Sequence, residues 1–201
     1  MFAAARQPMP VKESTEVRKL IMWNLITLDG YFEGAKNWDL PWHERLWGEE
    51  LERFSLDQLQ SADMLVFGRV TYEGMAAYWQ TETGAIADYM NRLPKVVCSR
   101  TLEAADWNNT TLVRQDAAKE VAKLKQHGDG NMFVFGSANL SETLMNENLF
   151  DEYRIGIAPV IHGGGRLLFT HGLRPQGLHL LETRQLSTGC LILRYKSEAV
   201  A

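Results

Sequence analysis

The segment at positions 131–140, NMFVFGSANL, decides the fold class. A short, continuous apolar run indicates a buried strand, and the glycine and small residues after it indicate a turn into a helix. The same order occurs at 63–73, DMLVFGRVTYE, and a similar strand end occurs at 95–101, KVVCSRT. Strands that alternate with helices predict a largely parallel sheet, and such sheets bind ligands at the carboxyl ends of their strands.

The remaining elements follow from hydrophobic periodicity and turn residues. Further strands are expected at 17–28, 110–114 and 152–161, and helices at 43–60, 69–78, 86–93, 116–126 and 139–146. The segment 179–196 indicates two strands around the turn Ser187-Thr188-Gly189. The sequence therefore predicts an α/β fold with a mixed, mostly parallel central sheet flanked by helices and a C-terminal antiparallel β-hairpin.

Composition limits the class of protein. The 201 residues are 45% hydrophobic and 23% charged, with a formal net charge of −4, which is ordinary for one globular domain. We expect that domain at 17–197, after a flexible leader at 1–16. A mildly acidic chain lacks the dense positive field that nucleic acids and anionic membranes attract, and it has no apolar run of about 18 residues. No nucleic-acid or membrane partner is expected.

The two cysteines, Cys98 and Cys190, lie inside apolar runs. We expect buried free thiols, because their spacing gives neither a CxxC motif nor a metal-ligand pattern. The first sixteen residues show no signal-peptide pattern, so a cytoplasmic protein without a bound metal is expected.

Strand ends carry the clearest binding chemistry. At the first, Gly68 permits a close backbone approach, Arg69 supplies a positive charge and Thr71 a hydroxyl, at an expected helix N-terminus that attracts anions. A tight turn with a threonine cap and a solvated arginine explains these residues equally well. At the second, Ser99 and Arg100 suit a phosphate such as the 2′-phosphate of NADPH, although such residues are also common in loops.

The third strand end, Gly136-Ser137-Ala138, has the order of a pyrophosphate cradle, and an ordinary turn with Ser137 as a helix cap explains it as well. It matches neither standard glycine pattern of nucleotide-binding proteins. The run Gly163-Gly164-Gly165 lacks the lysine that completes a P-loop, so we interpret it as a bend after a buried strand.

Five motifs in order resemble the RibD C-terminal-like branch of the dihydrofolate reductase superfamily, over residues 17–197. They are TLDG at 27–30, GRVTYE at 68–73, PKVVCSRTL at 94–102, MFVFGSANL at 132–140 and DEYRIGIAPVIHGGGRLLF at 151–169. The chain looks most similar to the stand-alone dihydrofolate reductase family proteins of bacteria.

This resemblance implies an NADPH-dependent oxidoreductase that transfers a hydride to a planar heterocycle of the pyrimidine, pterin or flavin type. The activity would be like that of 5-amino-6-(5-phosphoribosylamino)uracil reductase or dihydrofolate reductase, in a homodimer. The zinc deaminase pattern of the bifunctional riboflavin enzymes is absent from the sequence, so deamination is not expected. Two alternatives stay open: a catalytically silent, dimeric module that binds NADPH or another nucleotide, and a nucleotide or phosphosugar binder that does not use NADPH.

The resemblance also implies site residues. Those expected to bind the cofactor NADPH are Gly68, Arg69, Thr71, Ser99, Arg100, Gly136, Ser137, Ala138, Leu140 and Gly164. Leu28, Gly30 and Pro159 are expected to border the substrate, with Asp29 as the catalytic, proton-delivering carboxylate. Asp-Gly is also a common turn pair. The family usually has two adjacent glycines where this chain has Gly136-Ser137.

Other side chains have both a functional and a structural interpretation. We expect one of Trp38, Trp42 and Trp47 to wall a planar ring, although tryptophans also anchor loops and cores. His43 and His162 lie near loops that face the expected cleft, but a lone histidine is more often structural. The helix glutamates at 44, 49, 50 and 52 give no clear match to a catalytic acid and suit a solvated face.

Overall fold

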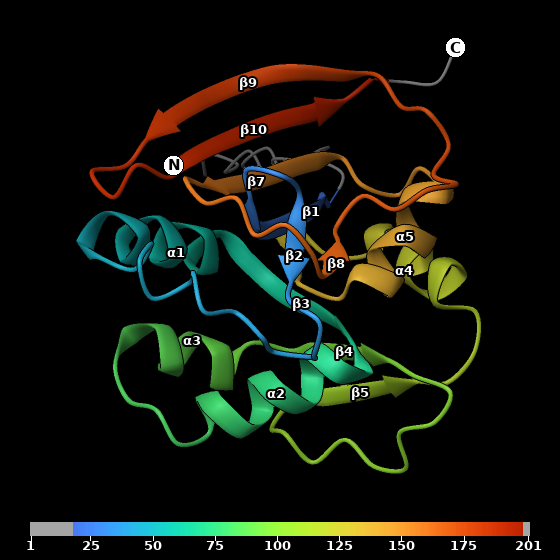
Figure 1. The fold of residues 1–201 in the computed structure, drawn as a ribbon. Helices are drawn as coiled ribbons and strands as arrows, with labels where there is room; N and C mark the ends of the chain where they lie inside the picture. The colour runs from blue at the N-terminus through green and yellow to red at the C-terminus, as the bar shows by residue number, and fades with distance from the viewer. Residues whose placement is uncertain (1–17, 199–201) are drawn as a thin grey trace, which may run out of the picture.

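A computed structural model describes residues 18–198, and the leader predicted at 1–16 lies outside this range. An eight-stranded sheet forms its centre, in the order β5-β4-β3-β6-β1-β7-β10-β9 (Figure 1). The parallel strands are β1 (Leu20–Thr27), β3 (Ala62–Gly68), β4 (Lys95–Cys98), β5 (Thr110–Val113), β6 (Asn131–Phe135) and β7 (Glu152–Ala158). The hairpin of β9 (Leu178–Gln185) and β10 (Leu191–Ser197) adds the antiparallel edge. The predicted fold class is confirmed.

Helices cover both faces of the sheet (Figure 1). Their bounds are α1 Glu49–Ser61, α2 Arg69–Trp79, α3 Ala85–Arg92, α4 Ala117–Lys125 and α5 Ala138–Asn146. Residues alternate along β1, so Leu20 and Met22 pack with α4 and α5, while Ile21 packs with α1, α2 and α3. Within 18–198, no helix combines the length and the apolar character needed to cross a bilayer.

Strand β1 lies near the middle of the sheet and extends further toward the carboxyl edge than its neighbour β6. Its register with β6 runs from Leu20↔Met132 to Trp23↔Phe135, whereas its register with β7 continues to Thr27↔Ala158. After Phe135 the chain turns away into α5. The end of β1 therefore borders an opening at the carboxyl edge of the sheet, on its β6 side, where β6 has already ended.

The structure corrects one predicted boundary and adds one small sheet. The helix expected at 43–60 begins at Glu49, because residues 41–46 form turns and Gly48, in an extended conformation, separates them from the helix. Leu46 from those turns is nevertheless buried. Strands β2 (Tyr31–Glu33) and β8 (Arg166–Leu167) pair as a separate sheet that was not predicted.

Candidate active site

Four neighbouring strands, β5, β4, β3 and β6, end at one cavity of about 740 Å³, which continues along β1 and α1. We call the part at the ends of β4 and β5, with Arg100 and Arg114, the basic end. The part along β1 and α1 is the aromatic end, where the tryptophans gather: Trp23, Trp38, Trp47 and Trp79. The ends of β3 and β6 lie between the two, as the strand order requires.

Two backbone loops meet in the centre of this cavity. The Gly68 N–H at the end of β3 donates to Ser137 Oγ at 2.8 Å, and the Ser137 N–H after β6 donates to Thr71 Oγ1 at 2.9 Å. Gly68 and Ser137 are the residues that precede α2 and α5, and neither caps its own helix with a side chain. The first N–H groups of both helices therefore remain available to an anion.

The backbone conformation at the centre of the cavity explains why residue 136 is a glycine. Gly136 has φ 61°, and a Cβ there would come within 3.0 Å of Thr71 Cγ2. Ser137 shares this left-handed conformation at φ 63°, although it is not glycine. Its two hydrogen bonds to the β3 side hold it there, since a lone non-glycine residue in this region is otherwise disfavoured.

The basic end is built from two arginines and an ordered loop. Ser99 Oγ accepts from the N–H groups of Thr101 and Leu102, so the serine holds the loop that carries the exposed Arg100. Arg114, which was not predicted, donates to the carbonyls of Leu102 and Glu103 at 2.7 and 2.8 Å. Arg114 directly follows β5, as Ser99 and Arg100 follow β4, and a basic residue at a second strand end was the signal that could have found it.

Burial keeps the one thiol in the cavity lining unreactive. Cys98 is free and half-buried, and burial, together with Glu120, raises the pKa of its thiol to about 12. The reactive thiolate is therefore scarce at neutral pH. Cys190 is free and fully buried.

At the aromatic end, Trp38 rests on helix α2. Its Nε1 donates to the Val70 carbonyl at 3.3 Å, and its ring lies so close to Gly74 that a Cβ on that residue would approach it to 2.1 Å. Trp47 also lines the cavity, whereas Trp42 is buried in the core, with its ring centroid 4.3 Å from that of His43. Two of the three tryptophans considered from the sequence therefore lie at the cavity.

Sequence comparison agrees with this architecture. Residues 18–192 match the RibD C-terminal domain family. The chain belongs to this family. It is 28% identical over 183 residues to YyaP of Bacillus subtilis (strain 168), an uncharacterized protein, covering 89% of this chain and 94% of that protein. The RibD C-terminal domain is a reductase domain, so the membership supports an oxidoreductase.

Solved structures share the fold. A putative riboflavin biosynthesis protein from Shewanella sp. PV-4 superposes with a TM-score of 0.73 at 20% identity, covering 90% of this chain and 99% of that one. Dihydrofolate reductase from Enterococcus faecalis, complexed with NADP(H) and RAB-propyl, gives a TM-score of 0.61 at 13% identity, covering 89% and 96%. The RibD C-terminal fold thus accounts for nearly the whole described chain.

In this RibD C-terminal domain, nine of the predicted cofactor residues come together at the cavity. They are Gly68, Arg69, Thr71, Ser99, Arg100, Gly136, Ser137, Ala138 and Leu140. Arg69 is exposed and pairs with Glu73 at 2.9 Å. Gly164, the tenth, is not among the lining residues.

Asp29, predicted as the proton-delivering carboxylate, is held by hydrogen bonds at the end of β1. It lies outside the cavity lining, as do Leu28, Gly30 and Pro159. Its carboxylate accepts from Thr27 Oγ1 at 2.6 Å and from the N–H groups of His162 and Gly163 at 3.1 and 2.7 Å. These hydrogen bonds, led by that of Thr27, lower the pKa of Asp29 to about 2, so the group is ionised at neutral pH. Asp29 anchors the glycine run to the end of β1.

Two ionisable side chains at the aromatic end, His43 and Glu33, are weak candidates for a proton donor. Burial lowers the pKa of His43 to about 4, so its imidazole is neutral at pH 7. Glu33 accepts from the Trp38 N–H at 3.1 Å and pairs with Arg166 at 3.5 Å. His162, the other histidine considered, is not among the lining residues.

Sequence reasoning missed two amide side chains that line the aromatic end, Asn24 and Gln58. They are 3% and 1% exposed. The signal was present in both: Asn24 interrupts the apolar run of β1, and Gln58 lies one turn after Phe54 on the buried side of α1.

Proposed function

We propose that this protein is an NADPH-dependent oxidoreductase that transfers a hydride to a planar heterocycle. The observation that carries the proposal is the joined pair of helix N-termini at Gly68 and Ser137, which lies between a basic end and an aromatic end of one cavity. A volume of about 740 Å³ is typical of cofactor and small-molecule sites.

The residues present suit NADPH along the length of the cavity. Gly136 allows close backbone approach, and the N-termini of α2 and α5 would hold a pyrophosphate. Arg100 would bind the 2′-phosphate, with Arg114 and Ser99 ordering its loop. NADPH, when bound, supplies the hydride. The tryptophans at the aromatic end would orient the substrate ring and exclude water.

A catalytically silent NADPH-binding module is the second candidate. Asp29 lies outside the cavity lining, and His43, whose pKa is about 4, is almost entirely without its acidic proton at neutral pH. A hydride acceptor that also needs a proton would then receive it from solvent or from the substrate's own groups. Turnover separates the two candidates, because a silent module binds NADPH and oxidises none of it across a substrate panel.

The first test is a titration of the purified protein with NADPH and with NADH. Trp23, Trp38, Trp47 and Trp79 line the cavity, so cofactor binding is expected to quench tryptophan fluorescence and raise the Tm. Selective binding of NADPH supports the proposal. Binding of neither cofactor contradicts it, and equal binding of both favours a nucleotide or phosphosugar binder without an NADPH requirement.

We also propose that the protein is a homodimer. We propose the reducing cytoplasm as its compartment, because free thiols such as those of Cys98 and Cys190 persist there. Strand β9 is one of the two edge strands of the sheet (Figure 1), and its Leu178, Leu180 and Leu181 are 41, 48 and 47% exposed. Exposed apolar side chains on an edge strand favour association with a second copy. Leu180→Lys should convert the dimer to a monomer in analytical ultracentrifugation, and a wild-type protein that is already monomeric contradicts the proposal.

A further inference from the structure

The connection between β4 and β5 lacks the helix that usually joins neighbouring parallel strands. It is the segment 99–109, which contains only bends and turns and carries Arg100 near its start (Figure 1). We call this segment the β4–β5 loop. A loop without a hydrogen-bonded ladder of its own needs side-chain contacts to hold one conformation, because ordering its backbone costs entropy.

Trp107 packs the far end of the β4–β5 loop in place of the missing helix. It is 2% exposed, and its ring lies against those of Phe67 and Tyr72, with centroids 5.9 and 6.0 Å apart. The Trp107 backbone N–H donates to the Tyr72 hydroxyl oxygen at 2.9 Å, and its indole N–H donates to Asn91 Oδ1 at 2.7 Å. Asn91 in turn donates to the Trp79 carbonyl at 2.8 Å. Trp107 therefore ties the loop to both α2 and α3.

Lys95 places an ammonium group inside this anchor. The side chain is 1% exposed, and Nζ donates to the carbonyls of Leu93 at 2.7 Å and of Asn91 at 3.2 Å, at the end of α3. Nζ also lies 4.5 Å from the centroid of the Trp107 ring, a distance at which the ring attracts a cation. Within residues 18–198, Lys95 forms no ion pair with a carboxylate. Its charge thus joins the end of α3 to Trp107.

This buried charge lowers the stability of the domain. Burial lowers the pKa of Lys95 to about 8, so the charged form is less favourable in the folded chain than in the unfolded chain. Methionine has a side chain of similar length and would fill the space without that cost. A buried charge that lowers stability indicates a role other than stability, since functional sites are where such costs are kept.

The proposed reductase function assigns the 2′-phosphate of NADPH to Arg100, and the present inference rests on it. We infer that Lys95 is a positioning residue for this phosphate site: its ammonium holds Trp107, and through Trp107 it holds the loop that carries Arg100. Ser99 and Arg114 hold the first half of the β4–β5 loop. Lys95 holds the second half from the core, and it is not among the residues that line the cavity.

Hydrogen exchange of the protein without cofactor tests the hold of Lys95 on the loop. In Lys95→Met, the backbone amides of 101–109 should exchange about tenfold or more faster, while the Tm stays equal to that of the wild type or rises. Lys125→Met is the matched control. Lys125 also donates to a carbonyl, that of Leu149 at 2.7 Å, but it pairs with Asp151 at 2.6 Å. Its loss should lower the Tm and leave exchange at 101–109 unchanged.

Two exchange results overturn the inference. One is unchanged exchange at 101–109 in Lys95→Met, which would show that the loop does not depend on the ammonium. The other is faster exchange throughout the domain with a lower Tm, which would show that Lys95 only stabilises the fold.

Cofactor selectivity gives a second readout in the same three proteins. NADPH affinity should fall several-fold in Lys95→Met while NADH affinity stays within about twofold, because only NADPH carries the phosphate assigned to Arg100. A lysine that only stabilises the fold would leave the ratio of the two affinities unchanged, and that result overturns the inference. Absence of NADPH binding in the wild-type protein counts against the proposed function alone, because the exchange comparison needs no cofactor and still tests the hold of Lys95 on the loop.

Discussion

The Ser137 hydroxyl accepts a hydrogen bond from the Gly68 N–H at 2.8 Å, and this contact joins the loop after β6 to the loop after β3. Removing the hydroxyl leaves the Gly68 N–H without this partner. Ser137→Ala should therefore lower the free energy of unfolding by about 1–3 kcal/mol and weaken NADPH binding. Ser137→Gly should lose less stability, because glycine adopts the φ of 63° found at this position without strain. Urea unfolding measures both.

The control for that pair is Ser61→Ala, which removes a hydroxyl that donates within its own helix to the Gln58 carbonyl. It should change the free energy of unfolding by less than about 0.5 kcal/mol. Equal stability of Ser137→Ala and Ser137→Gly would show that the backbone conformation of Ser137 is not strained.

Gly74→Ala should move Trp38. Alanine in place of a helical glycine stabilises a helix by about 0.5–1 kcal/mol, but the new Cβ would lie 2.1 Å from the Trp38 ring. The ring must therefore leave α2, which should shift tryptophan emission to longer wavelength and reduce NADPH affinity several-fold. Gly48→Ala is the control, since a Cβ there meets nothing within 4 Å. An unchanged emission spectrum in Gly74→Ala would contradict the contact.

Arg100→Ala should affect NADPH and NADH differently. If Arg100 binds the 2′-phosphate, its removal costs a charge-assisted hydrogen bond, so NADPH affinity should fall by about tenfold or more while NADH affinity stays within twofold. Arg92→Ala removes an exposed arginine that is not among the lining residues and should alter neither. Parallel losses for both cofactors after Arg100→Ala would remove the 2′-phosphate assignment.

His43 should make the protein less stable in mild acid. Burial lowers the pKa of His43 to about 4 from the ordinary 6.5, so the unfolded chain binds a proton between these values that the folded chain does not. Stability attributable to this group is fully present above pH 6.5 and is lost as pH falls toward 4, by up to about 3 kcal/mol. His43→Phe should reduce the fall in Tm between pH 7 and pH 5, whereas His171→Phe, at an exposed position, should not. Identical pH profiles for wild type and His43→Phe would contradict this effect.

The sequence predicts the sheet well because its signals are local. Apolar runs followed by glycine marked the ends of β3 and β6. The helix expected at 116–126 is α4, and its cap Asp116 accepts from the Lys119 N–H at 3.1 Å. The pair β2 and β8 could not be predicted, because strands of three and two residues are defined by their pairing across the fold. The start of α1 was wrong because Leu46 fits the helical period although it belongs to a turn.

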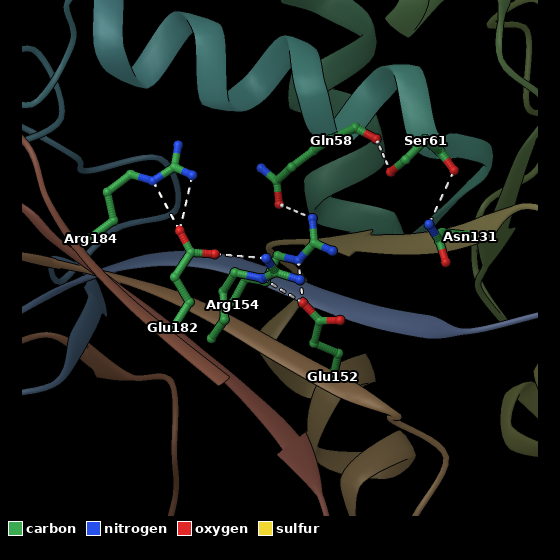
Figure 2. Close-up of polar contacts among 8 residues, drawn as sticks. Gln58, Ser61, Asn131, Glu152, Arg154, Glu182 and Arg184 are labelled. Atoms are coloured by element: carbon green, nitrogen blue, oxygen red, sulfur yellow. Dashed lines mark hydrogen bonds and ion pairs between the residues drawn. The ribbon is translucent and has the colours of Figure 1, made fainter. Parts of the chain in front are cut away.

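The candidate site could likewise be predicted only where its residues lie close together in the sequence. The loops predicted to bind the cofactor carry their polar and glycine residues next to one another in the sequence, and nine of the ten predicted residues line one cavity. The hydrogen bonds of Asp29 could not be predicted from neighbouring sequence, because its partners His162 and Gly163 lie more than 130 positions away. The Gln58 amide is oriented by Arg154 (Figure 2), which lies on a strand that pairs with β1 and β10. Local sequence cannot reveal a role that depends on such distant contacts.

The central place of β1 has a consequence for how the chain folds. Leu20 pairs with Met132 and Ile21 with Glu152, so the strand emerges from the ribosome long before either neighbour. At ordinary synthesis rates the delay is on the order of ten seconds. Contacts this distant in sequence slow folding, and an apolar strand that waits for them is prone to aggregation. Nascent chains that stop before β6 should therefore depend on chaperones, and the dependence should end once β7 has left the exit tunnel.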